Sequence, residues 1–548
     1  MSSPRPSRLP AVPLQAVCEV SGAHLTEQDR PLTASDVMAS DVMVSGVTLD
    51  SRTVHHGDLY AALPGYHAHG AAFAGPAVAG GAVAVLTDPE GARLVVAQKL
   101  DVPVLVCEEP RRVLGSVAAQ IYGRPAEHLA LVGITGTNGK TTTAYLVESG
   151  LRHLGVTAGL IGTVETRLGT RRLPSARTTP EATDLHAIFA MMLEEGSTAA
   201  VMEVSSHALS QHRVDGATFD VALFTNLSQD HLDFHPTMED YFAAKALLFT
   251  PEHARRGLVC IDDEWGARLA KEAGVPVETL TSHAEVDADW TVRQGVWPHF
   301  TLEGQVGRLA LQCHLPGEFN VVNTAMAAVT LLMLGHDLRA VTAAMVEEPV
   351  VPGRMQRVTA SAAADADPRG IVDYAHTPIA VAAALQALRP TTAGRLVVVL
   401  GAGGDRDRGK RRAMGAAAAR WADDVIVTDD NPRSEDPAVI RAELEAGAEF
   451  AAEAELQSGA DPEAGAWAGS PGATGRATLE NVGGRSAAIG RAVEIARAAI
   501  PARDNTVIVL GKGHETGQEV AGTVHAFDDR EALRAAFDGV PYRPGEVR

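Results

Sequence analysis

Short runs of consecutive apolar residues recur along most of the chain, each followed by a polar or glycine-rich turn and then by a helical stretch. In the middle of the chain these runs occupy residues 129–134, 199–204, 221–225 and 258–261. Parallel strands that are buried on both faces have this pattern, and the lengths between the runs suit crossover helices. The pattern therefore predicts an α/β domain with a mostly parallel sheet over residues 127–350.

A second set of apolar runs follows Pro352-Gly353 and predicts a further α/β domain over residues 351–548. Within it, residues 449–482 are rich in Ala, Gly, Glu and Ser, which is typical of a flexible insertion. The apolar runs of this domain lie at residues 371–372, 396–400, 425–427 and 506–510.

The beginning of the chain has a different character. Residues 41–126 contain short apolar runs broken by glycine, such as 82–86, and predict a small α/β domain. Residues 1–40 contain several prolines and predict a loose N-terminal extension.

The composition narrows the classes of protein that fit. Of the 548 residues, 46% are hydrophobic and 21% are charged, as in a soluble globular enzyme, and the formal net charge of −21 disfavours binding to nucleic acid. The four cysteines lack C-x-x-C spacing, no run of about 18 apolar residues predicts a membrane span, and the N-terminus lacks the apolar core of a signal peptide. We therefore expect a cytoplasmic protein with no nucleic-acid partner and no membrane span.

A glycine-rich loop follows the first apolar run of the middle domain. The segment 135–142 reads Thr-Gly-Thr-Asn-Gly-Lys-Thr-Thr and leads from a predicted strand into a predicted helix. Backbone N–H groups in such a loop bind phosphate oxygens, the lysine reaches the β- and γ-phosphates, and the next hydroxyl ligates Mg²⁺. The spacing departs from G-x-x-x-x-G-K-[ST], because Ile134 occupies the first glycine position. The candidate ATP-binding residues here are Gly136, Thr137, Asn138, Gly139, Lys140, Thr141 and Thr142.

Polar clusters also follow the next two apolar runs. Glu203 comes at the end of one run and His231 after the other. Ligands of open α/β sheets bind at the carboxyl ends of strands, and carboxylates hold Mg²⁺ during phosphoryl transfer, so these two side chains and Thr141 are candidate metal ligands. The alternative for Glu203 is an ordinary surface carboxylate. Lys245, on an amphipathic helix over residues 241–249, is by itself a lysine that snorkels to solvent.

The loop sequence resembles that of the Mur ligase superfamily, which includes the folylpolyglutamate synthases and whose members activate a carboxylate as an acyl phosphate for attack by an amine. The resemblance extends over about residues 44–535. It implies a three-domain architecture with a central P-loop-type, mostly parallel sheet and a C-terminal Rossmann-like α/β domain. It also implies that Lys140, Glu203, His231 and Lys245 are catalytic, with Lys245 carbamylated so that it helps to bind a second Mg²⁺.

From Thr178-Thr179-Pro180 onward the segments resemble the MurE branch of this superfamily. The branch implies a UDP-sugar site in the N-terminal domain, a muramoyl-dipeptide site after it, and further contacts with ATP. Without the resemblance, Ser205 is equally well explained as a helix N-cap. The implied UDP-precursor contacts are Leu49, Ser51, Tyr66, His67, Ala68, Thr178, Thr179, Ser205, Gln211 and Arg213, and the implied ATP contacts are Asn320, Arg354 and Asp373.

The late segment Asp430-Asn431-Pro432-Arg433 bears on which amino acid is added. Members of the branch that add diaminopimelate carry this sequence, whereas those that add lysine lack the arginine. The physical reason is that a planar guanidinium grips the distal carboxylate that lysine lacks, and a buried arginine without that partner is costly. Arg406, Gly511 and Glu515 also match diaminopimelate-binding positions. Gly483-Gly484-Arg485 departs from the family, which more often has an acidic residue before the arginine, and we expect it to lie away from the site.

These features together predict an ATP- and Mg²⁺-dependent ligase, expected to be a monomer, that adds diaminopimelate to the D-Glu γ-carboxylate of UDP-MurNAc-L-Ala-D-Glu. The choice between meso- and LL-diaminopimelate stays open. One alternative is a folylpolyglutamate synthase-like ligase, which the Asp430–Arg433 segment and the UDP-type domain disfavour. The other is a non-catalytic UDP-precursor-binding scaffold, which has no need for Lys140, Glu203, His231 and Lys245.

Overall fold

The computed structural model of the chain describes residues 4–8, 11–27, 30–31, 42–65, 67–175, 177–346, 349–361, 367–405, 407–458 and 477–544. They fall into two compact units. The first comprises Met1–Ser228, Thr237–Gln312 and Asn323–Glu347, and the second Gln229–Pro236, Cys313–Val322 and Glu348–Arg548. Among the described residues, no helix combines the length and the apolar character needed to cross a bilayer.

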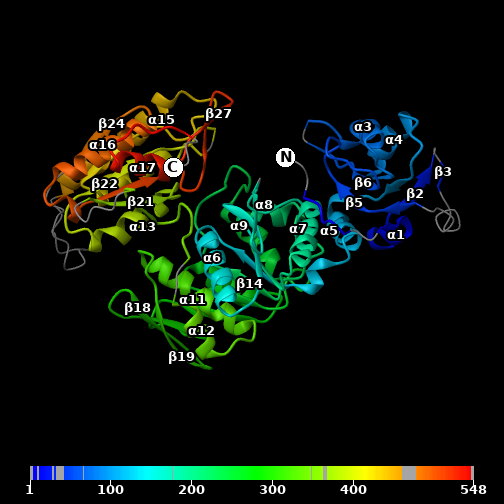
Figure 1. Cartoon of the computed structure of the whole chain (residues 1–548), viewed down its shortest axis with the longest axis horizontal. Coiled ribbons are helices and arrows are strands. Elements are labelled where there is room, and N and C mark those ends of the chain that lie inside the picture. The colour runs from blue at the N-terminus through cyan, green and yellow to red at the C-terminus, as the bar shows by residue number, and fades with distance from the viewer. Residues whose placement is uncertain are drawn as a thin grey trace. The chain divides into compact units, whose positions relative to one another are not determined.

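The first unit begins with a six-stranded sheet in which β5 to β8 run parallel, while β2 and β3 are antiparallel additions (Figure 1). Its helices are α1 (Leu14–Ser21), α3 (Ala74–Ala79), α4 (Pro89–Ala97) and α5 (Pro110–Ile121). The strands, in sheet order, are β3 (Arg30–Pro31), β2 (His24–Glu27), β8 (Val104–Val106), β7 (Ala84–Thr87), β6 (Asp58–Ala61) and β5 (Gly46–Thr48). A separate short pair joins β1 (Val12–Pro13) to β4 (Met43–Val44).

The loose extension predicted for residues 1–40 is wrong where the structure describes it. Helix α1 buries Leu14 and Val17 in the core of this sheet, and β2 pairs with β8. The Arg5 guanidinium hydrogen-bonds to the carboxylate of Asp58, which is fully buried. Apolar burial and an ion pair therefore make this segment part of the N-terminal domain, despite its prolines.

An eleven-stranded sheet forms the rest of the first unit, and it is parallel from β10 through β17 with antiparallel strands at both edges. The predicted runs 129–134, 199–204, 221–225 and 258–261 are confirmed as strands to within about a residue. The strands, in sheet order, are β12 (Arg171–Pro174), β11 (Glu165–Leu168), β10 (Ala158–Ile161), β13 (Ala199–Glu203), β9 (Ala130–Thr135), β14 (Val221–Phe224), β15 (Gly257–Cys260), β16 (Val277–Thr281), β17 (Trp290–Gln294), β18 (His299–Gly304) and β19 (Gly307–Gln312).

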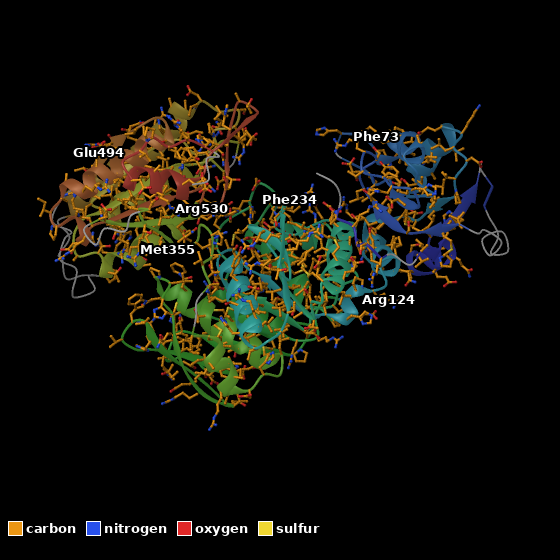
Figure 2. All side chains as sticks on the ribbon, viewed as in Figure 1. Phe73, Arg124, Phe234, Met355, Glu494 and Arg530 are labelled. Atoms are coloured by element: carbon orange, nitrogen blue, oxygen red, sulfur yellow. The ribbon has the colours of Figure 1, made fainter. Side chains whose placement is uncertain are left out.

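Helices connect these strands, and apolar side chains of the helices and the sheet form a buried core. Figure 2 draws the side chains of the described residues on the ribbon. The predicted helix at 241–249 is confirmed as α9 followed by the short turn η3 (Leu247–Phe249). The helices are α6 (Lys140–His153), α7 (Ala182–Glu194), α8 (Ser206–Ser210), α9 (Met238–Ala246), α10 (Glu264–Glu272), α11 (Glu318–Met333) and α12 (Leu338–Ala344).

The second unit contains a six-stranded sheet, parallel except for its edge strand β20. Helices α13 (Pro378–Leu388), α14 (Lys410–Trp421) and α15 (Pro437–Ser458) cover one face, and α16 (Arg485–Ala498) and α17 (Asp529–Phe537) cover the other. The strands, in sheet order, are β20 (Gln356–Val358), β21 (Arg369–Asp373), β25 (Thr506–Leu510), β22 (Leu396–Leu400), β23 (Asp424–Val427) and β24 (Thr478–Asn481), and a hairpin joins β26 (Gly517–Val520) to β27 (Thr523–Ala526). The four predicted runs 371–372, 396–400, 425–427 and 506–510 are confirmed as strands β21, β22, β23 and β25.

The flexible insertion predicted for residues 449–482 is wrong at both of its ends. Helix α15 continues to Ser458, and residues 478–481 form β24, which pairs with β23. Ala and Glu are strong helix formers, so their abundance extended a helix rather than a loop. The remainder of the segment, 459–476, lies outside the described residues.

Candidate active site

The glycine-rich loop joins β9 to the N-terminus of α6 as predicted. Gly136 and Gly139 have φ of 142° and 86°, and a Cβ on them would lie 1.9 Å from Thr225 Oγ1 and 2.5 Å from Asn323 Oδ1. Only glycine fits both positions. The Lys140 ammonium donates to the carbonyls of Gly136 (2.8 Å) and Thr137 (2.9 Å). The loop thus has the strand–turn–helix form that suits an anion, at the start of a 14-residue helix.

Glu203 ends β13, the strand beside β9, and its side chain points into this loop region. The carboxylate accepts hydrogen bonds from the Thr141 hydroxyl (2.9 Å), the Thr163 N–H (2.8 Å) and the Thr163 hydroxyl (3.2 Å). Glu203 is only 1% exposed, and within the described residues it forms no ion pair. The alternative of a surface carboxylate is therefore wrong, and among the described residues only neutral donors hold this buried carboxylate.

This donor set fits Mg²⁺. The Thr141 hydroxyl and the Glu203 carboxylate are adjacent hard oxygens, which Mg²⁺ prefers. In the part of the chain that the structure describes, no group of three or more His, Cys, Asp or Glu side chains forms a protein-only metal cage. Mg²⁺ in nucleotide sites has few protein ligands and takes phosphate and water oxygens for the rest, so the small donor set is what such a site needs.

Lys245 lies on α9 and is 1% exposed, so it does not snorkel to solvent. Its ammonium donates to the Gly136 carbonyl (2.9 Å), the same oxygen that Lys140 uses, and lies 4.4 Å from the centroid of the Tyr241 ring. The hydroxyls of Tyr241 and Thr137 are 3.3 Å apart. Helix α9 thus brings a buried amine to the glycine-rich loop, a contact between segments about a hundred residues apart in the sequence.

A cavity of about 1470 Å³ lies in the first unit and is lined by the N-terminal sheet and by the segment around β12 and α7. Leu49, Ser51 and Ala68 line it, His67 is exposed, and Tyr66 lies outside the described residues. The arginines among its lining residues are Arg5, Arg52, Arg111, Arg171 and Arg177. A wall with this many guanidinium groups suits a ligand that carries phosphates or carboxylates.

The predicted muramoyl-dipeptide residues gather beside the Glu203 strand. The Thr179 hydroxyl donates to the Glu203 carbonyl (2.9 Å) and accepts from the Ser205 N–H (3.1 Å), and the Thr178 and Thr163 hydroxyls are 3.0 Å apart. The Ser205 side chain caps α8, so its interpretation as an N-cap is confirmed.

Sequence reasoning missed an arginine cluster next to these residues. Arg213 Nε lies 3.0 Å from the carboxylate of Glu181, and Arg213 Nη2 donates to Gln211 Oε1 (2.6 Å). Arg111 and Arg177 approach the same carboxylate at 3.2 and 3.5 Å, and burial together with these two charges lowers the pKa of Arg213. Three guanidinium groups around one carboxylate leave an excess of positive charge, which no motif in the sequence could indicate because α5 and α7 bring the side chains together.

In the second unit, two of the predicted ATP contacts, Arg354 and Asp373, lie near the end of β21, while Asn320 lies in the first turn of α11. Asp373 accepts from the N–H groups of Met355 (2.7 Å) and Ala375 (2.8 Å), and burial raises its pKa despite the charge of Arg354. The Arg354 guanidinium lies 4.4 Å from the centroid of the Tyr374 ring. The Asn320 amide donates to the Pro316 carbonyl (2.7 Å).

His231 also belongs to the second unit and has a φ of 55°. Its Nε2 lies 3.7 Å from Asp230, whose carboxylate is 4.0 Å from His376. Burial alone would raise the pKa of Asp230, but the positive charges of His231, His376 and Lys410 outweigh it and lower that pKa. Asp230 is therefore held ionised beside His231.

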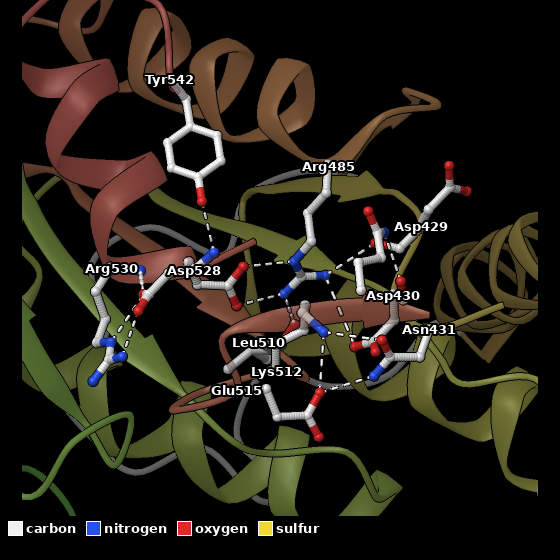
Figure 3. A network of polar contacts seen from close by, with 12 residues as sticks. Asp429, Asp430, Asn431, Arg485, Leu510, Lys512, Glu515, Asp528, Arg530 and Tyr542 are labelled. Carbon is white, nitrogen blue, oxygen red and sulfur yellow. Dashed lines mark hydrogen bonds and ion pairs between the residues drawn. The ribbon is translucent and has the colours of Figure 1, made fainter. Parts of the chain in front are cut away.

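The predicted diaminopimelate residues occupy two loops of the second unit, after β23 and after β25 (Figure 3). The amide of Asn431 donates to Glu515 (2.8 Å), and the buried ammonium of Lys512 donates to Asn431 (3.1 Å) and Glu515 (3.0 Å). Arg433 has a φ of 51° and donates to the Gly404 carbonyl (2.6 Å). Pro432 stands between Asn431 and Arg433, and Arg406 lies outside the described residues.

Arg485 does not lie away from these loops, so that prediction is wrong. It is the first residue of α16, and its fully buried guanidinium donates to the carbonyls of Asp429 (3.2 Å) and Leu510 (2.8 Å). One carbonyl precedes the first diaminopimelate loop and the other precedes the second (Figure 3). A connection of about 60 residues separates Asp429 from Arg485, which is why spacing in the sequence could not indicate the contact.

Known protein families match the chain along most of its length. Residues 43–122 match the Mur ligase family catalytic domain, residues 134–331 the Mur ligase middle domain, and residues 353–513 the Mur ligase glutamate ligase domain. The UDP-N-acetylmuramoyl-L-alanyl-D-glutamate–2,6-diaminopimelate ligase of Streptomyces avermitilis is 48% identical over 97% of this chain and 98% of its own. The ligase of the same name from Corynebacterium glutamicum is 45% identical over 90% and 91%.

Solved structures agree. A UDP-N-acetylmuramoyl-L-alanyl-D-glutamate–2,6-diaminopimelate ligase superposes with a TM-score of 0.60 and 30% identity over 91% of this chain and 95% of its own. The fold is shared with MurF from Thermotoga maritima in complex with ADP, at a TM-score of 0.59 and 16% identity over 91% and 98%. A Mycobacterium tuberculosis folylpolyglutamate synthase covers 73% of this chain, against 92% of its own, with a TM-score of 0.55 and 19% identity. With three successive domain models matched and nearly half of its residues shared with full-length relatives, the chain belongs to the Mur ligase family of ATP-dependent ligases.

Proposed function

We propose that the chain joins diaminopimelate to the D-Glu γ-carboxylate of UDP-MurNAc-L-Ala-D-Glu, with ATP hydrolysed to ADP and phosphate. The observation that carries the proposal is the turn Asp430–Arg433 cross-linked to the loop of Glu515 through Asn431 and Lys512. It offers a guanidinium for a distal carboxylate and a carboxylate for a distal ammonium, which a diamino diacid has and a simpler amine lacks. The names of the relatives support the same substrate.

The activation step uses the first unit. We assign the phosphates of ATP to the backbone of Gly136–Thr142 and to the Lys140 ammonium, and the UDP-precursor to the arginine-lined cavity with Leu49, Ser51, Ala68, Thr178, Thr179, Ser205, Gln211 and Arg213. Arg354, Asp373 and Asn320 are assigned to the nucleotide as well. Transfer of the γ-phosphoryl group to the γ-carboxylate gives an acyl phosphate, and positioning and charge neutralisation supply most of the catalysis.

Mg²⁺ fits Thr141 and Glu203, and we assign His231 and a carbamylated Lys245 to further Mg²⁺ ligation. The ion would neutralise charge on the phosphoryl oxygens. Carbamylation would change the Lys245 side chain from a cation, which now donates to the Gly136 carbonyl, to an anionic oxygen ligand.

The second step needs the amine of diaminopimelate near the acyl carbon. Arg433 and Glu515 would hold the distal end of the amino acid, so that the reacting amine is oriented for attack. Attack by the neutral amine forms the C–N bond and gives a tetrahedral intermediate. Its collapse breaks the bond between the acyl carbon and the phosphate oxygen, phosphate leaves with the bonding electron pair, and the nitrogen gives up one proton to the departing phosphate. We further propose that the enzyme is cytoplasmic and acts as a monomer. Light scattering of the purified protein tests the monomeric state, and fractionation of cells tests the location.

The decisive experiment measures ADP release in the presence of UDP-MurNAc-L-Ala-D-Glu with diaminopimelate or with lysine. We expect kcat/KM for diaminopimelate to exceed that for lysine at least about 100-fold, because lysine has no distal carboxylate for the Arg433 guanidinium to bind. Equal values for the two amines, or ADP release that does not depend on the UDP-precursor, would refute the proposal. Folate and glutamate, offered together in place of the UDP-precursor and diaminopimelate, test the folylpolyglutamate alternative and should give no ADP release.

A further inference from the structure

Arg485 is hydrogen-bonded to the two residues that lead into the diaminopimelate loops, Asp429 and Leu510. It begins α16, whose apolar face packs Ala488, Ile489 and Ala492 against the sheet, and it follows Gly484, which has a φ of 86°. From this position the side chain reaches between the carboxyl ends of the central strands of the second unit (Figure 3). A Cβ placed on Gly401, just after β22, would lie 3.1 Å from Arg485 Nη1, so the fit under this strand is close as well.

The guanidinium makes contacts in three directions. Nη2 donates to the Leu510 carbonyl at the end of β25 (2.8 Å), and Nη1 donates to the Asp429 carbonyl after β23 (3.2 Å). Nε and Nη2 also donate to the two carboxylate oxygens of Asp529, at 2.6 and 2.7 Å. A rigid planar fork can do this, whereas the single ammonium of lysine cannot span the same partners.

Both side chains of the Arg485–Asp529 ion pair are fully buried, so neither can turn away into solvent. Burial alone would lower the pKa of Arg485, but the charge of Asp529 raises it, and the arginine stays charged. A buried pair of this kind adds little to fold stability compared with apolar packing, and in some proteins such a pair specifies a single geometry.

Arg485 fixes the position of the loop after β23 relative to the loop after β25. The Asp430 carboxylate lies 3.9 Å from Arg485 Nη1 on one side. On the other side it lies so near Gly511 that a Cβ there would be 2.3 Å from Asp430 Oδ2, and Gly511 has a φ of 114°. Next to this contact, the Lys512 ammonium donates hydrogen bonds to Asn431 and Glu515. The two loops therefore rest on a common buried cation.

We propose that Arg485 is a positioning residue for the amino-acid substrate: by fixing the carbonyls of Asp429 and Leu510, it sets the distance between the loop of Arg433 and the loop of Glu515. This inference rests on the proposed function of these loops. It adds to that proposal a residue that touches no substrate but decides whether the two ends of the amino-acid pocket match their ligand. A displacement of about 1 Å in such a pocket is enough to weaken binding or catalysis strongly.

The test compares Arg485→Lys with Arg491→Lys in the full-length enzyme. Arg491 lies on the same helix but is exposed and pairs with Glu480, so it is a matched control for the substitution. We expect Arg485→Lys to raise KM for diaminopimelate at least about tenfold, while KM for ATP and for UDP-MurNAc-L-Ala-D-Glu change less than about twofold. Arg491→Lys should leave all three unchanged. Equal rises in all three KM values, or no rise for diaminopimelate, would overturn the inference.

A second variant, Asp529→Glu, tests the same inference in case Arg485→Lys does not fold. Asp529→Glu keeps the buried ion pair and moves the guanidinium by roughly one methylene, so it should also raise KM for diaminopimelate selectively. If neither variant folds, the pair is purely structural and the inference is overturned. Assaying each variant with whichever amine the wild type accepts separates this test from the proposed function. A wild-type enzyme that prefers lysine would refute the assignment of diaminopimelate as the substrate. The effect of Arg485→Lys on KM for lysine would then still test the positioning role of Arg485.

Discussion

Glu203→Gln exchanges a buried carboxylate for an amide of nearly the same shape. Within the part of the chain that the structure describes, its Oε1 position accepts only from the Thr163 N–H, a role that the glutamine oxygen can keep. Its Oε2 position faces two hydroxyls, those of Thr141 and Thr163, and both can rotate to accept from the glutamine NH₂. No donor is left facing a donor, so the free energy of unfolding should change by less than about 1 kcal/mol, or rise as an unpaired buried charge is removed.

Although we expect Glu203→Gln to leave stability nearly unchanged, we expect it to impair catalysis strongly. If the carboxylate serves to hold Mg²⁺ beside Thr141, the neutral amide loses that charge, and kcat should fall at least about 100-fold. The Mg²⁺ concentration needed for half-maximal ADP release should rise. Urea unfolding measures the first effect and a Mg²⁺ titration of ADP release measures the second.

Glu264→Gln is the matched control, because Glu264 is exposed at the start of α10 and should change neither quantity. A Glu203→Gln enzyme that retained wild-type kcat and Mg²⁺ dependence would refute the metal role. One that lost more than about 2 kcal/mol of stability would refute the hydrogen-bond argument, because the amide would then have failed to replace the carboxylate.

Three other substitutions test other parts of the molecule. Arg433→Lys should raise KM for diaminopimelate at least about tenfold in steady-state assays, since an ammonium cannot grip a carboxylate with two parallel bonds. Gly139→Ala places a Cβ 2.5 Å from Asn323 Oδ1 at a φ of 86°, so nucleotide titration should show ATP binding weakened at least about tenfold. Burial alone would raise the pKa of Asp215, but hydrogen bonds from two histidines lower it to about 2. Its stabilisation is therefore present above about pH 4 and lost as the pH falls through 2, so Asp215→Asn should cost about 2 kcal/mol in urea unfolding at pH 6 and far less at pH 2.

The sheet strands and the glycine-rich loop could be predicted from the sequence because their signals are contiguous. Strands buried on both faces are unbroken apolar runs, and Leu396–Leu400 and Thr506–Leu510 coincide with such runs. The loop of Gly136 and Gly139 carries its strand, turn and helix within a few residues. The order of the strands follows from their pairing, and that required the structure.

Features that depend on contacts between distant segments could not be predicted. Arg111 meets Glu181 across 70 residues, and Arg485 meets Asp429 across 56. Composition was misleading in two places. Prolines suggested a loose start, although Leu14 is buried in a core, and an Ala- and Glu-rich stretch suggested flexibility where a helix continues to Ser458.

In this chain, positioning residues and ligand-binding residues differ in the partners of their buried charges. Arg485 and Lys512 are matched by the carboxylates of Asp529 and Glu515, and each cross-links loops that the folded protein must hold still. Glu203 is as deeply buried but is held by neutral donors within the described residues, an arrangement that costs free energy unless a cation arrives. Folding alone gives no reason to keep such a charge, whereas binding does. A matched buried charge therefore indicates positioning, and an unmatched one indicates where a ligand completes the site.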